Sequence, residues 1–544
     1  MRNKNIIITK EIDCQYCYKC LRNCPVKSIR FSRGKSYVLN DDCILCGVCI
    51  DVCPQQARTY ISDLPRFSEI IQKPFLVSIA PSFFAHYDEP LKVLTFLRKL
   101  GATFIQETAV GADIVSFYYR KSFHENKNKS IITTSCPVVY NLAEKYYPKV
   151  INYLAPFLSP MNVHANFMKQ YVGDYPIVFI GPCIAKKLDD EKVDVVLTFE
   201  ELDKFISMEK VNINLLPETY PDPPYPNRGR FYPISGGINN TVGGNWENYL
   251  VLEGIDNIVK IFENIENFKT QFFIEASACF GGCIGGPAIR KDTSLFEKRQ
   301  RILEFERRLS QLSGEIVNPE EVDLQIEREF FAKSKEIHVP PEKIEEVLRE
   351  MGKTSPKKHL NCGACGYSSC REKAIAVVLG NAEKEMCITY LIDKVSSISN
   401  TIIERIPNIV IIYQNNKLLY LNPKGEEFFE DKMELIDYVL EEIESGKSYI
   451  ELSIDNENYV FFVKFFNLPQ SHGKVALLID VTAEKQKDER LKNLKKEALE
   501  KIEEVINRQM YLAQEISSIL GESIAETKSY FLKFKNFLEE DVDL

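Results

Sequence analysis

Sixteen cysteines occur in this chain, and their spacing limits the possible folds more than any other feature. Eight of them form two runs with the same pattern, C-x2-C-x2-C-x3-C-P, and the second run repeats the first after 29 residues. The first run is Cys14, Cys17, Cys20 and Cys24, followed by Pro25, and the second is Cys43, Cys46, Cys49 and Cys53, followed by Pro54. Such self-similarity indicates an internal duplication.

This run resembles the bacterial ferredoxin pattern, in which three cysteines hold one [4Fe-4S] cluster and the fourth crosses to the other cluster. The resemblance implies that Cys53 completes the first set and that Cys24 completes the second. A zinc site is the alternative, but zinc motifs seldom contain two consecutive C-x2-C steps, a fourth cysteine and a proline. We therefore predict a 2[4Fe-4S] ferredoxin-type domain at residues 1–62, able to pass single electrons.

Length and charge restrict the class of protein. A chain of 544 residues is too long for one hydrophobic core, so several domains are expected. Its net charge of -9 and its mixed acidic and basic residues argue against a nucleic-acid partner. The absence of an eighteen-residue apolar run and of a signal-peptide pattern predicts a cytoplasmic protein with no membrane partner. In that compartment, clustered cysteines are metal ligands more often than disulfides.

Residues 63–292 have an α/β pattern, with strand-like runs at 75–79 and 177–180 and helical stretches such as 91–100. Four more cysteines are far apart in this region, and each alone would be an ordinary buried thiol. They occur in Thr133-Thr134-Ser135-Cys136-Pro137, in Gly181-Pro182-Cys183-Ile184-Ala185-Lys186-Lys187, and in Cys279-Phe280-Gly281-Gly282-Cys283-Ile284-Gly285-Gly286-Pro287.

Together these segments resemble the three signature segments of the [FeFe]-hydrogenase catalytic domain, over about residues 75–290. The resemblance implies a [4Fe-4S] cluster on Cys136, Cys183, Cys279 and Cys283. Cys283 would also bridge to a diiron subcluster with CO, cyanide and dithiolate ligands, the whole being the H-cluster. Lys186 would donate a hydrogen bond to a cyanide. The other residues expected at the same pocket are Ser159, Gly181, Pro182, Gly236, Gly237 and Ser277.

The chain departs from catalytic hydrogenases along the proton path. Ser135 stands where those enzymes have a cysteine that relays protons, and a hydroxyl is a far weaker acid than a thiol of pKa about 8.5. Tyr118 and Tyr119 replace acidic residues, and Ala155 replaces a relay serine. Two methionines of the family are also replaced, by Gly181 and Ser277. Retained ligands and a lost relay predict slow proton delivery.

We therefore expect a sensor of hydrogen or redox state, with reversible H2/proton chemistry at low turnover. An ordinary ferredoxin-linked [FeFe]-hydrogenase is one alternative, and an electron-transfer iron-sulfur protein without a diiron unit is another. The expected partners are H2 and protons, an electron-transfer protein such as ferredoxin, and a signalling kinase, phosphatase or other component of a hydrogenase system.

Residues 293–353 are charged and helix-prone, which predicts a helical linker. Residues 354–392 then contain a C-G-x-C-G-x3-C-x16-C pattern, formed by Cys362, Cys365, Cys370 and Cys387. This pattern resembles the small [4Fe-4S] domain of electron-transfer and corrinoid iron-sulfur proteins, although zinc also suits four cysteines. With this set, four [4Fe-4S] clusters are expected.

Residues 399–485 contain no cysteine, and their strand-like runs resemble a PAS domain; an unrelated α+β unit is the alternative. Residues 486–544 are helix-prone, with a stripe typical of a coiled coil at Leu491, Leu494, Ala498, Ile502 and Val505. The stripe predicts a homodimer, unless a single helix folds back onto the PAS-like unit. The whole chain is thus expected to be a multidomain α/β protein with a signalling segment at residues 486–544.

Overall fold

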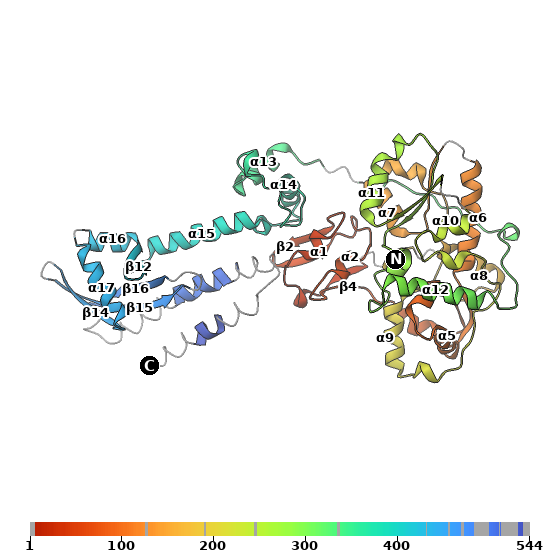
Figure 1. Ribbon diagram of the computed structural model, residues 1–544, viewed down its shortest axis with the longest axis horizontal. Coiled ribbons are helices and arrows are strands. Elements are labelled where there is room, and N and C mark those ends of the chain that lie inside the picture. The colour runs from red at the N-terminus through yellow and green to blue at the C-terminus, as the bar shows by residue number, and fades with distance from the viewer. Residues whose placement is uncertain are drawn as a thin grey trace.

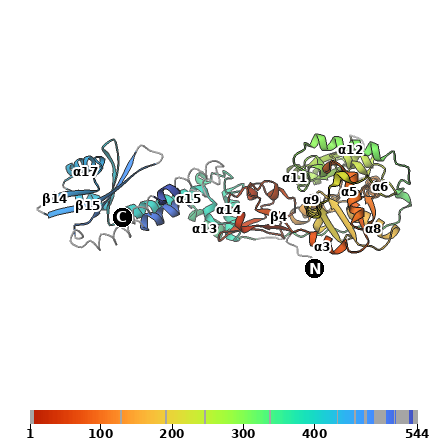
Figure 2. The same ribbon diagram turned by 90° about the horizontal axis from the view of Figure 1, so that it is seen from below.

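The computed structural model describes residues 6–125, 129–189, 192–243, 247–334, 338–430, 432–454, 457–468, 473–482, 500–510, 512 and 531–536. Figure 1 shows the N-terminal domain between the large central domain and the C-terminal half of the chain. Figure 2, turned by 90°, shows the same order along the long axis. The N-terminal domain therefore has neighbours on both sides.

The N-terminal domain is built from two similar halves. Its elements are β1 (Ile7–Thr9), η1 (Glu11–Asp13), α1 (Lys19–Arg22), β2 (Ile29–Ser32), β3 (Lys35–Val38), α2 (Val48–Asp51) and β4 (Arg58–Tyr60). β1 pairs with β4 and β2 with β3, both antiparallel. Tyr18 before α1 and Gly47 before α2 are 29 residues apart, and both have left-handed backbones, with φ of 55° and 79°. The sequence repeat is thus also a structural repeat.

The central domain contains two parallel sheets. One has the order β6-β5-β8-β9 and the other β10-β11-β7. Their bounds are β5 (Phe75–Ile79), β6 (Ala102–Glu107), β7 (Ile131–Ile132), β8 (Ile177–Gly181), β9 (Val195–Thr198), β10 (Tyr249–Glu253) and β11 (Phe273–Ser277). Every residue of β5 and β8 is buried, as expected of parallel strands that are covered on both faces.

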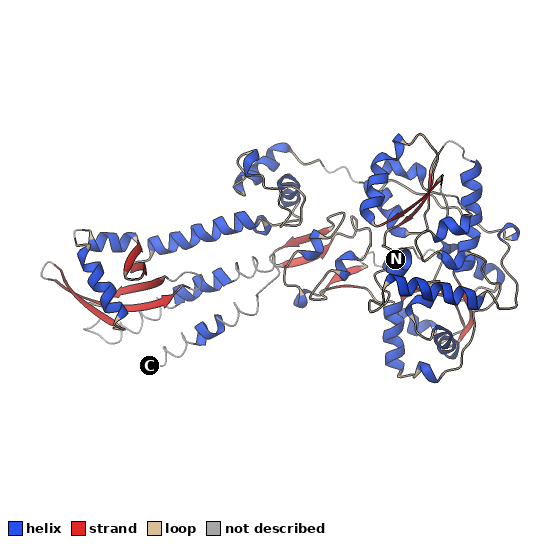
Figure 3. Cartoon of the chain, viewed as in Figure 1, coloured by secondary structure: helices blue, strands red, loops and turns tan. Residues whose placement is uncertain are grey.

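Helices surround these sheets (Figure 3). They are α3 (Leu64–Ile70), α4 (Phe83–His86), α5 (Pro90–Lys99), α6 (Ala109–Glu125), α7 (Pro137–Tyr146), α8 (Pro160–Tyr171), α9 (Phe199–Glu209), α10 (Gly237–Val242) and α11 (Ile255–Asn264). Short 3-10 turns are η2 (Pro148–Tyr153), η3 (Ile184–Leu188), η4 (Ile213–Leu215), η5 (Gly229–Phe231), η6 (Ile265–Asn267) and η7 (Gly282–Gly285). α7 and α8 begin with a proline, whose fixed φ suits a first helical position.

Residues 293–353 differ from the expected helical linker. They contain α12 (Leu295–Leu309), η8 (Pro319–Glu321) and α13 (Pro341–Glu350), with irregular chain between the helices. Ile302 and Leu309 are buried in the central core, so α12 belongs to that domain. Isolated β-bridges join Ile316 to Tyr225 and Glu327 to Phe157. Residues 295–333 form a strap across the central domain, where Val317, Val322 and Ile326 are also buried. By contrast, α13 packs against α14 of the Cys362 region.

The C-terminal half follows the Cys362 region. That region contains η9 (Pro356–Lys358), α14 (Cys370–Val378) and η10 (Lys384–Met386), and α15 (Ile388–Arg405) leads out of it. The next unit contains β12 (Ile409–Gln414), β13 (Lys417–Leu421), α16 (Pro423–Phe429), α17 (Glu434–Glu444), β14 (Tyr449–Ile454), β15 (Glu457–Asn467) and β16 (Lys474–Asp480). Its sheet is antiparallel, with the order β13-β12-β16-β15-β14, and its core includes the apolar face of α17.

Most of the expected coiled-coil stripe, including Leu491, Leu494 and Ala498, lies outside the described residues. Residues 500–510 are helical, and Ile502 packs against a hydrophobic cluster of the C-terminal sheet. Gln509 Nε2 donates a hydrogen bond to Ser399 Oγ of α15 at 2.8 Å. In the part of the chain that the structure describes, no helix is long and apolar enough to cross a membrane.

Candidate metal centre

The carboxyl ends of three parallel strands converge on one cavity in the central domain. Cys136 follows β7, Cys183 follows β8, and Cys279 follows β11. These strands belong to both sheets, and the crevice outside the carboxyl ends of parallel strands is where open α/β folds bind ligands. The cavity has a volume of about 110 Å³, and Cys136, Cys183, Cys279 and Cys283 all line it. We call these four cysteines the central set.

A glycine turn returns the chain from Cys279 to Cys283. Gly281 and Gly282 have φ of +77° and +79°, a backbone conformation that favours glycine. A Cβ at Gly282 would lie 2.7 Å from the carbonyl oxygen of Pro233, so this position also lacks space for a side chain. The turn therefore needs glycine to place both thiols on the same cavity.

Burial raises the pKa of three thiols of the central set, those of Cys183, Cys279 and Cys283. Burial, followed by the effect of Cys136, raises the pKa of Cys183 to about 11. The same two causes raise the pKa of Cys283 to about 12, although its side chain is accessible from the cavity. Because metals bind thiolates, occupation of the site would release the protons of these thiols.

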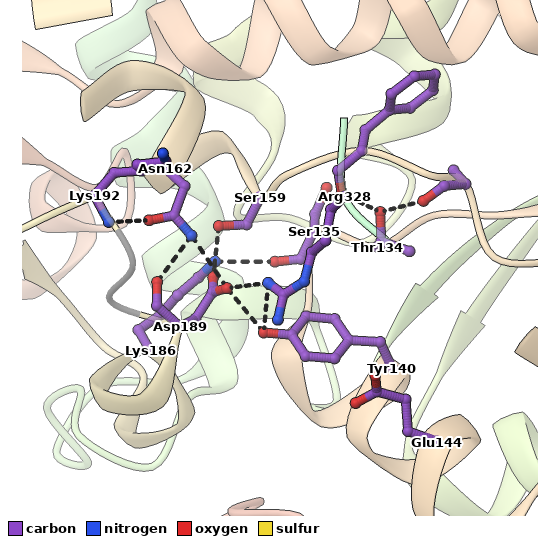
Figure 4. A network of polar contacts seen from close by, with 12 residues as sticks. Thr134, Ser135, Tyr140, Glu144, Ser159, Asn162, Lys186, Asp189, Lys192 and Arg328 are labelled. Carbon is purple, nitrogen blue, oxygen red and sulfur yellow. Dashed lines mark hydrogen bonds and ion pairs between the residues drawn. The ribbon is translucent and has the colours of Figure 1, made fainter. Parts of the chain in front are cut away.

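Lys186 lies on the cavity wall and has two partners in the protein. Its Nζ donates to Asp189 Oδ2 at 2.9 Å and to the carbonyl oxygen of Ser135 at 3.2 Å. Asp189 is fully buried, and Figure 4 shows it at the meeting point of several polar side chains. The carboxylate thus fixes the position of the ammonium at the edge of the cavity.

Four other side chains share that carboxylate. Ser159 Oγ donates to Asp189 Oδ2 at 2.5 Å, while Tyr140 Oη and Arg328 Nη1 donate to Asp189 Oδ1 at 2.8 and 2.7 Å. Asn162 Nδ2 donates to the same atom at 3.2 Å. Burial alone would raise the pKa of Asp189, but Lys186 and Arg328 outweigh it and hold that pKa below its usual value. Arg328 comes from the strap, which therefore contributes to the site.

Ser135 has a hydroxyl partner where the resemblance implies acidic residues. Tyr119 Oη lies 3.1 Å from Ser135 Oγ and 3.3 Å from Thr134 Oγ1, and it accepts from the backbone N–H of Thr134. Burial raises the pKa of Tyr119, so its hydroxyl stays protonated near neutral pH. Both residues were expected from the sequence to replace members of the relay, but the hydrogen bond between their hydroxyl groups was not predicted.

The other expected pocket residues divide into two groups. Ser135, Pro182, Lys186 and Ser277 line the cavity. Ser159, Gly181, Gly236 and Gly237 are not among the residues that line it. Ser159 points to Asp189; a Cβ at Gly181 would meet the ring of Phe179, and one at Gly237 would meet the carbonyl oxygen of Phe231. Gly236 donates its N–H to the buried Glu275 carboxylate at 2.8 Å.

The N-terminal cysteines form two groups that follow the expected crossing. Cys53 and Cys17 both act on the pKa of Cys14, and Cys17 and Cys14 act on that of Cys20. The Cys43 set comprises Cys43, Cys46, Cys49 and Cys24, which line one small cavity. We call the other group the Cys14 set, comprising Cys14, Cys17, Cys20 and Cys53.

The last four cysteines also surround one cavity. Cys362, Cys365, Cys370 and Cys387 line it, together with Tyr367 and Lys373, and we call them the Cys362 set. Cys387 is the N-cap residue of α15. Within the described residues, no group of three His, Cys, Asp or Glu side chains has the geometry for a single metal ion. Four thiols around a space suit an iron-sulfur cluster, which lies between its ligands.

Comparison with protein families identifies three segments. Residues 73–248 and 239–287 match the "Iron only hydrogenase large subunit, C-terminal domain". The central domain is a distant homologue of the [FeFe]-hydrogenases. Residues 6–54 match the "4Fe-4S dicluster domain", and residues 359–389, which include the Cys362 set, match an "Fe-S cluster" family. The chain is thus a multidomain protein with a ferredoxin-like domain and an [FeFe]-hydrogenase-like domain.

The curated relatives found include hydrogenases and Fe-S cluster assembly factors. Iron hydrogenase 1 of Clostridium pasteurianum is 24% identical over 374 residues, covering 47% of this chain and 65% of the relative. The NADP-reducing hydrogenase subunit HndD of Solidesulfovibrio fructosivorans is 23% identical and covers 48% and 58%. The cytosolic Fe-S cluster assembly factor NAR1 of Yarrowia lipolytica is 23% identical and covers 38% and 51%. The chain therefore spans between half and two thirds of these relatives.

Solved structures of [FeFe]-hydrogenases were also found. That of HydA1 from Chlamydomonas reinhardtii is 16% identical, with a TM-score of 0.39, and the match covers 51% of this chain and all of the solved chain. A structure describing oxygen inactivation of the H cluster is 17% identical, with a TM-score of 0.38 and the same coverage.

The donor set in the central domain fits the group that [FeFe]-hydrogenases hold. Four thiols surround one cavity, and a fixed ammonium lies at its wall. Met161 and Tyr232 line the same space, and both were missed from the sequence. Cys136, Cys183, Cys279 and Cys283 would therefore hold the cluster, with Lys186 beside it.

Proposed function

We propose that this protein senses hydrogen or redox state at an [FeFe]-hydrogenase-type site and reports it to a partner. The observation that carries the proposal is the set of side chains at the central cavity. All four cysteines converge on it, whereas the proton-relay position is occupied by the Ser135 hydroxyl, hydrogen-bonded to Tyr119. Ligand positions are complete while the residues for rapid proton transfer are replaced. A binding site with slow turnover suits a sensor better than a fast catalyst.

The surrounding side chains have defined tasks in this proposal. When bound, the H-cluster would supply the reversible splitting of H2 into protons and electrons. Lys186, held by Asp189, offers its remaining N–H to an anionic ligand in the cavity. Ser135 holds a proton at Oγ and exchanges it with Tyr119 Oη. Because both hydroxyls are very weak acids, such exchange is slow.

The C-terminal half is the proposed output. An α+β unit that we assign as PAS-like follows the Cys362 set through α15, and helical residues 500–510 pack beside it. The proposed partners are an electron-transfer protein such as ferredoxin and a signalling kinase, phosphatase or hydrogenase component. A homodimer through residues 486–544 stays a prediction.

Exposure to hydrogen tests the proposal. Protein that has been purified and loaded with the diiron cofactor without oxygen is placed under H2, and cluster reduction is followed by visible absorption. The expected result is reduction of the clusters together with dye-linked turnover well below that of a catalytic hydrogenase. No change in cluster redox state under H2 would overturn it, and rapid turnover would favour the ordinary ferredoxin-linked hydrogenase.

A second candidate is an iron-sulfur protein that carries only [4Fe-4S] clusters. The similarity to Fe-S cluster assembly factors favours it, since the NAR1 relative matches 38% of this chain. Iron content discriminates the two, because a diiron unit adds two iron atoms to the cluster on the central set. A chain that never takes up the extra iron, whatever the loading conditions, would support this candidate.

A further inference from the structure

The region around the Cys362 set docks onto the ferredoxin-like domain, although more than 300 residues separate them in sequence. The backbone N–H of Phe31 in β2 donates a hydrogen bond to the carbonyl oxygen of Asn381 at 3.2 Å. This bond joins the backbones of the two regions. Arg22 Nη1 donates to the carbonyl oxygen of Ala364 at 3.3 Å. The N–H of Arg33 donates to the Glu383 carboxylate. Both views show α14 beside the N-terminal domain (Figures 1 and 2).

An apolar contact lies beneath these hydrogen bonds. Leu21 and Phe31 from the ferredoxin-like domain share one hydrophobic cluster with Tyr367 and Met386. All four side chains are at most 5% exposed. Burial of this kind stabilises a fixed docking geometry rather than a passing encounter.

Gly366 brings the cysteine loop into direct contact with α1. Its φ is +94°, and a Cβ at this position would lie 2.9 Å from Leu21 Cγ. Gly366 follows Cys365, and Leu21 follows Cys20 in the short helix before Cys24. Because Gly366 has no side chain, the backbone of the cysteine loop can lie directly against Leu21 of α1.

Tyr367 is close to cysteines of both sets. It lines the cavity of the Cys362 set and shares a hydrophobic cluster with Cys24, against which Cys365 also packs. Its hydroxyl is buried and has no hydrogen-bond partner among the described residues. Leaving a buried hydroxyl unpaired costs free energy, so an acceptor such as a cluster sulfur suits this position. The Lys27 ammonium also lies near both Cys24 and Cys365.

The Cys43 set reaches the central cavity on its other side. Cys46 is part of the wall of that cavity. A Cβ at the adjacent Gly47 would lie 2.7 Å from Pro287 Cβ, so the two domains touch closely there. Cys46 therefore faces the central set, while Cys24 of the same set faces the Cys362 set.

We propose that the Cys43 set is a branch point, from which electrons pass directly to the Cys362 set without entering the Cys14 set. One electron leaves the [4Fe-4S] cluster on the Cys43 set and reduces the one on the Cys362 set, and no bond forms or breaks. The inference rests on the proposed function for the presence of the clusters, but not on any reaction with hydrogen. The Cys14 set is left as a separate route to external electron carriers.

The route ends where the output segment begins. Cys387 belongs to the Cys362 set and is the N-cap of α15, whose other end meets the C-terminal sheet. There Asn422 Nδ2 donates to the carbonyl oxygens of Ile403 and Asn408, and its Oδ1 accepts from the N–H of Val410 in β12. One helix, α15, thus connects Cys387 to the C-terminal sheet, so a redox change at the Cys362 set could reach that sheet through it.

Electron paramagnetic resonance of the full chain tests the route. The protein is reconstituted with iron and sulfide and reduced by light and a flavin, without hydrogen. Two reduced clusters that lie close together split each other's signals, and we expect such splitting for the Cys362-set cluster. The splitting should persist in Cys17→Ala, which alters the Cys14 set, and disappear in Cys46→Ala, which alters the Cys43 set at the equivalent position.

A matched glycine pair tests the docking contact. Gly366→Leu should weaken the splitting, because its side chain meets Leu21, whereas Gly363→Leu should not. Gly363 is in the same loop with φ of +71°, and the only contact for its Cβ is the Tyr367 carbonyl at 4.0 Å. If the Gly366→Leu variant does not assemble the cluster of the Cys362 set, the same spectrum is recorded for the Tyr367→Ala variant instead. Unsplit signals in the wild-type chain, or splitting that survives Cys46→Ala, would overturn the branch-point proposal while leaving the hydrogen response intact.

Discussion

Ser135 and Tyr119 form the hydroxyl pair on which the proposal of slow turnover rests. Their oxygens are 3.1 Å apart, so a hydrogen bond links them, but neither group gives up a proton readily near neutral pH. In the proposed function, this hydrogen bond is a proton path whose two groups are very weak acids. Turnover should respond to the acidity of this one side chain.

Restoring the thiol is the direct test. In Ser135→Cys, dye-linked hydrogen turnover should rise at least about tenfold, since general acid–base catalysis typically contributes 10²–10⁴-fold. Ser68→Cys, which adds an exposed thiol on α3, is the control and should have no effect. An unchanged rate in Ser135→Cys, with equal cluster content, would show that proton delivery is not limiting.

Asp189 is the second residue on which the site depends. Asp189→Asn leaves Lys186 and Arg328 without their shared buried carboxylate, so we expect a loss of about 3–5 kcal/mol in stability. Asp88→Asn, at an exposed pair with Arg290 and Arg301, should cost only about 0–1 kcal/mol. Anaerobic unfolding measures both. Equal losses would contradict the structural role of the Asp189 network.

His164 predicts a pH dependence of stability. It is fully buried between Ser78 and Gln106, and burial lowers its pKa to about 3. The unfolded chain takes up a proton at the ordinary pKa of 6.5, but the folded chain does not. The contribution of His164 to stability is therefore lost as pH falls below 6.5, by about 1.3 kcal/mol between pH 7 and pH 5.5.

The measurement compares wild type with His164→Gln. Burial raises the pKa of Glu275 to about 7 and of Asp113 to about 6, so these two carboxyls favour the folded state as pH falls and together outweigh the loss at His164. Because both proteins contain these carboxyls, the difference between their free energies of unfolding reports the contribution of His164 alone. If the difference in free energy of unfolding between wild type and His164→Gln stays the same from pH 7 to pH 5.5, the buried imidazole is not neutral as the account requires.

At the scale of elements, the site is made by three strand ends and one glycine turn. β7, β8 and β11 deliver one cysteine each, and η7 returns Cys283 to the same cavity. Because the strands lie in two sheets, the site depends on how those sheets are packed. The strap adds Arg328 from outside both sheets.

Gly282→Ala should disrupt the turn. Its φ of +79° is costly for alanine, by roughly 1–2 kcal/mol, and its Cβ would meet the carbonyl oxygen of Pro233. We expect less iron bound per central domain after anaerobic reconstitution. Gly34→Ala, with φ of +66° and open space around the Cβ, incurs the backbone cost alone and should retain normal iron content. Full iron content in Gly282→Ala would contradict a requirement for glycine.

Sequence reasoning succeeded where local spacing carries the information. The ferredoxin-like duplication and the hydrogenase-like segments were predicted from short motifs, and the family matches confirm both domains. Asp189 and Arg328 were missed because 139 residues separate them and only the fold brings them together. The helical linker was expected from charge and periodicity, yet tertiary contacts of Ile302 and Leu309 draw α12 into the central core.

At the scale of the molecule, the ferredoxin-like domain lies between the two regions that carry the other cysteine sets (Figure 1). Cys46 contributes to the central cavity, and Leu21 contacts the loop of the Cys362 set. The chain thus places a hydrogenase-like site at one end and an α+β unit at the other. This order suits the proposed conversion of a redox event into a structural signal.

An infrared spectrum tests the central claim most directly. The protein is purified without oxygen, supplied with the diiron cofactor and scanned where metal-bound CO and cyanide absorb. The account predicts bands of both ligands that shift when hydrogen replaces argon. A spectrum without such bands, from protein whose four cysteine sets are fully loaded with iron and sulfide, would contradict a hydrogen-responsive site.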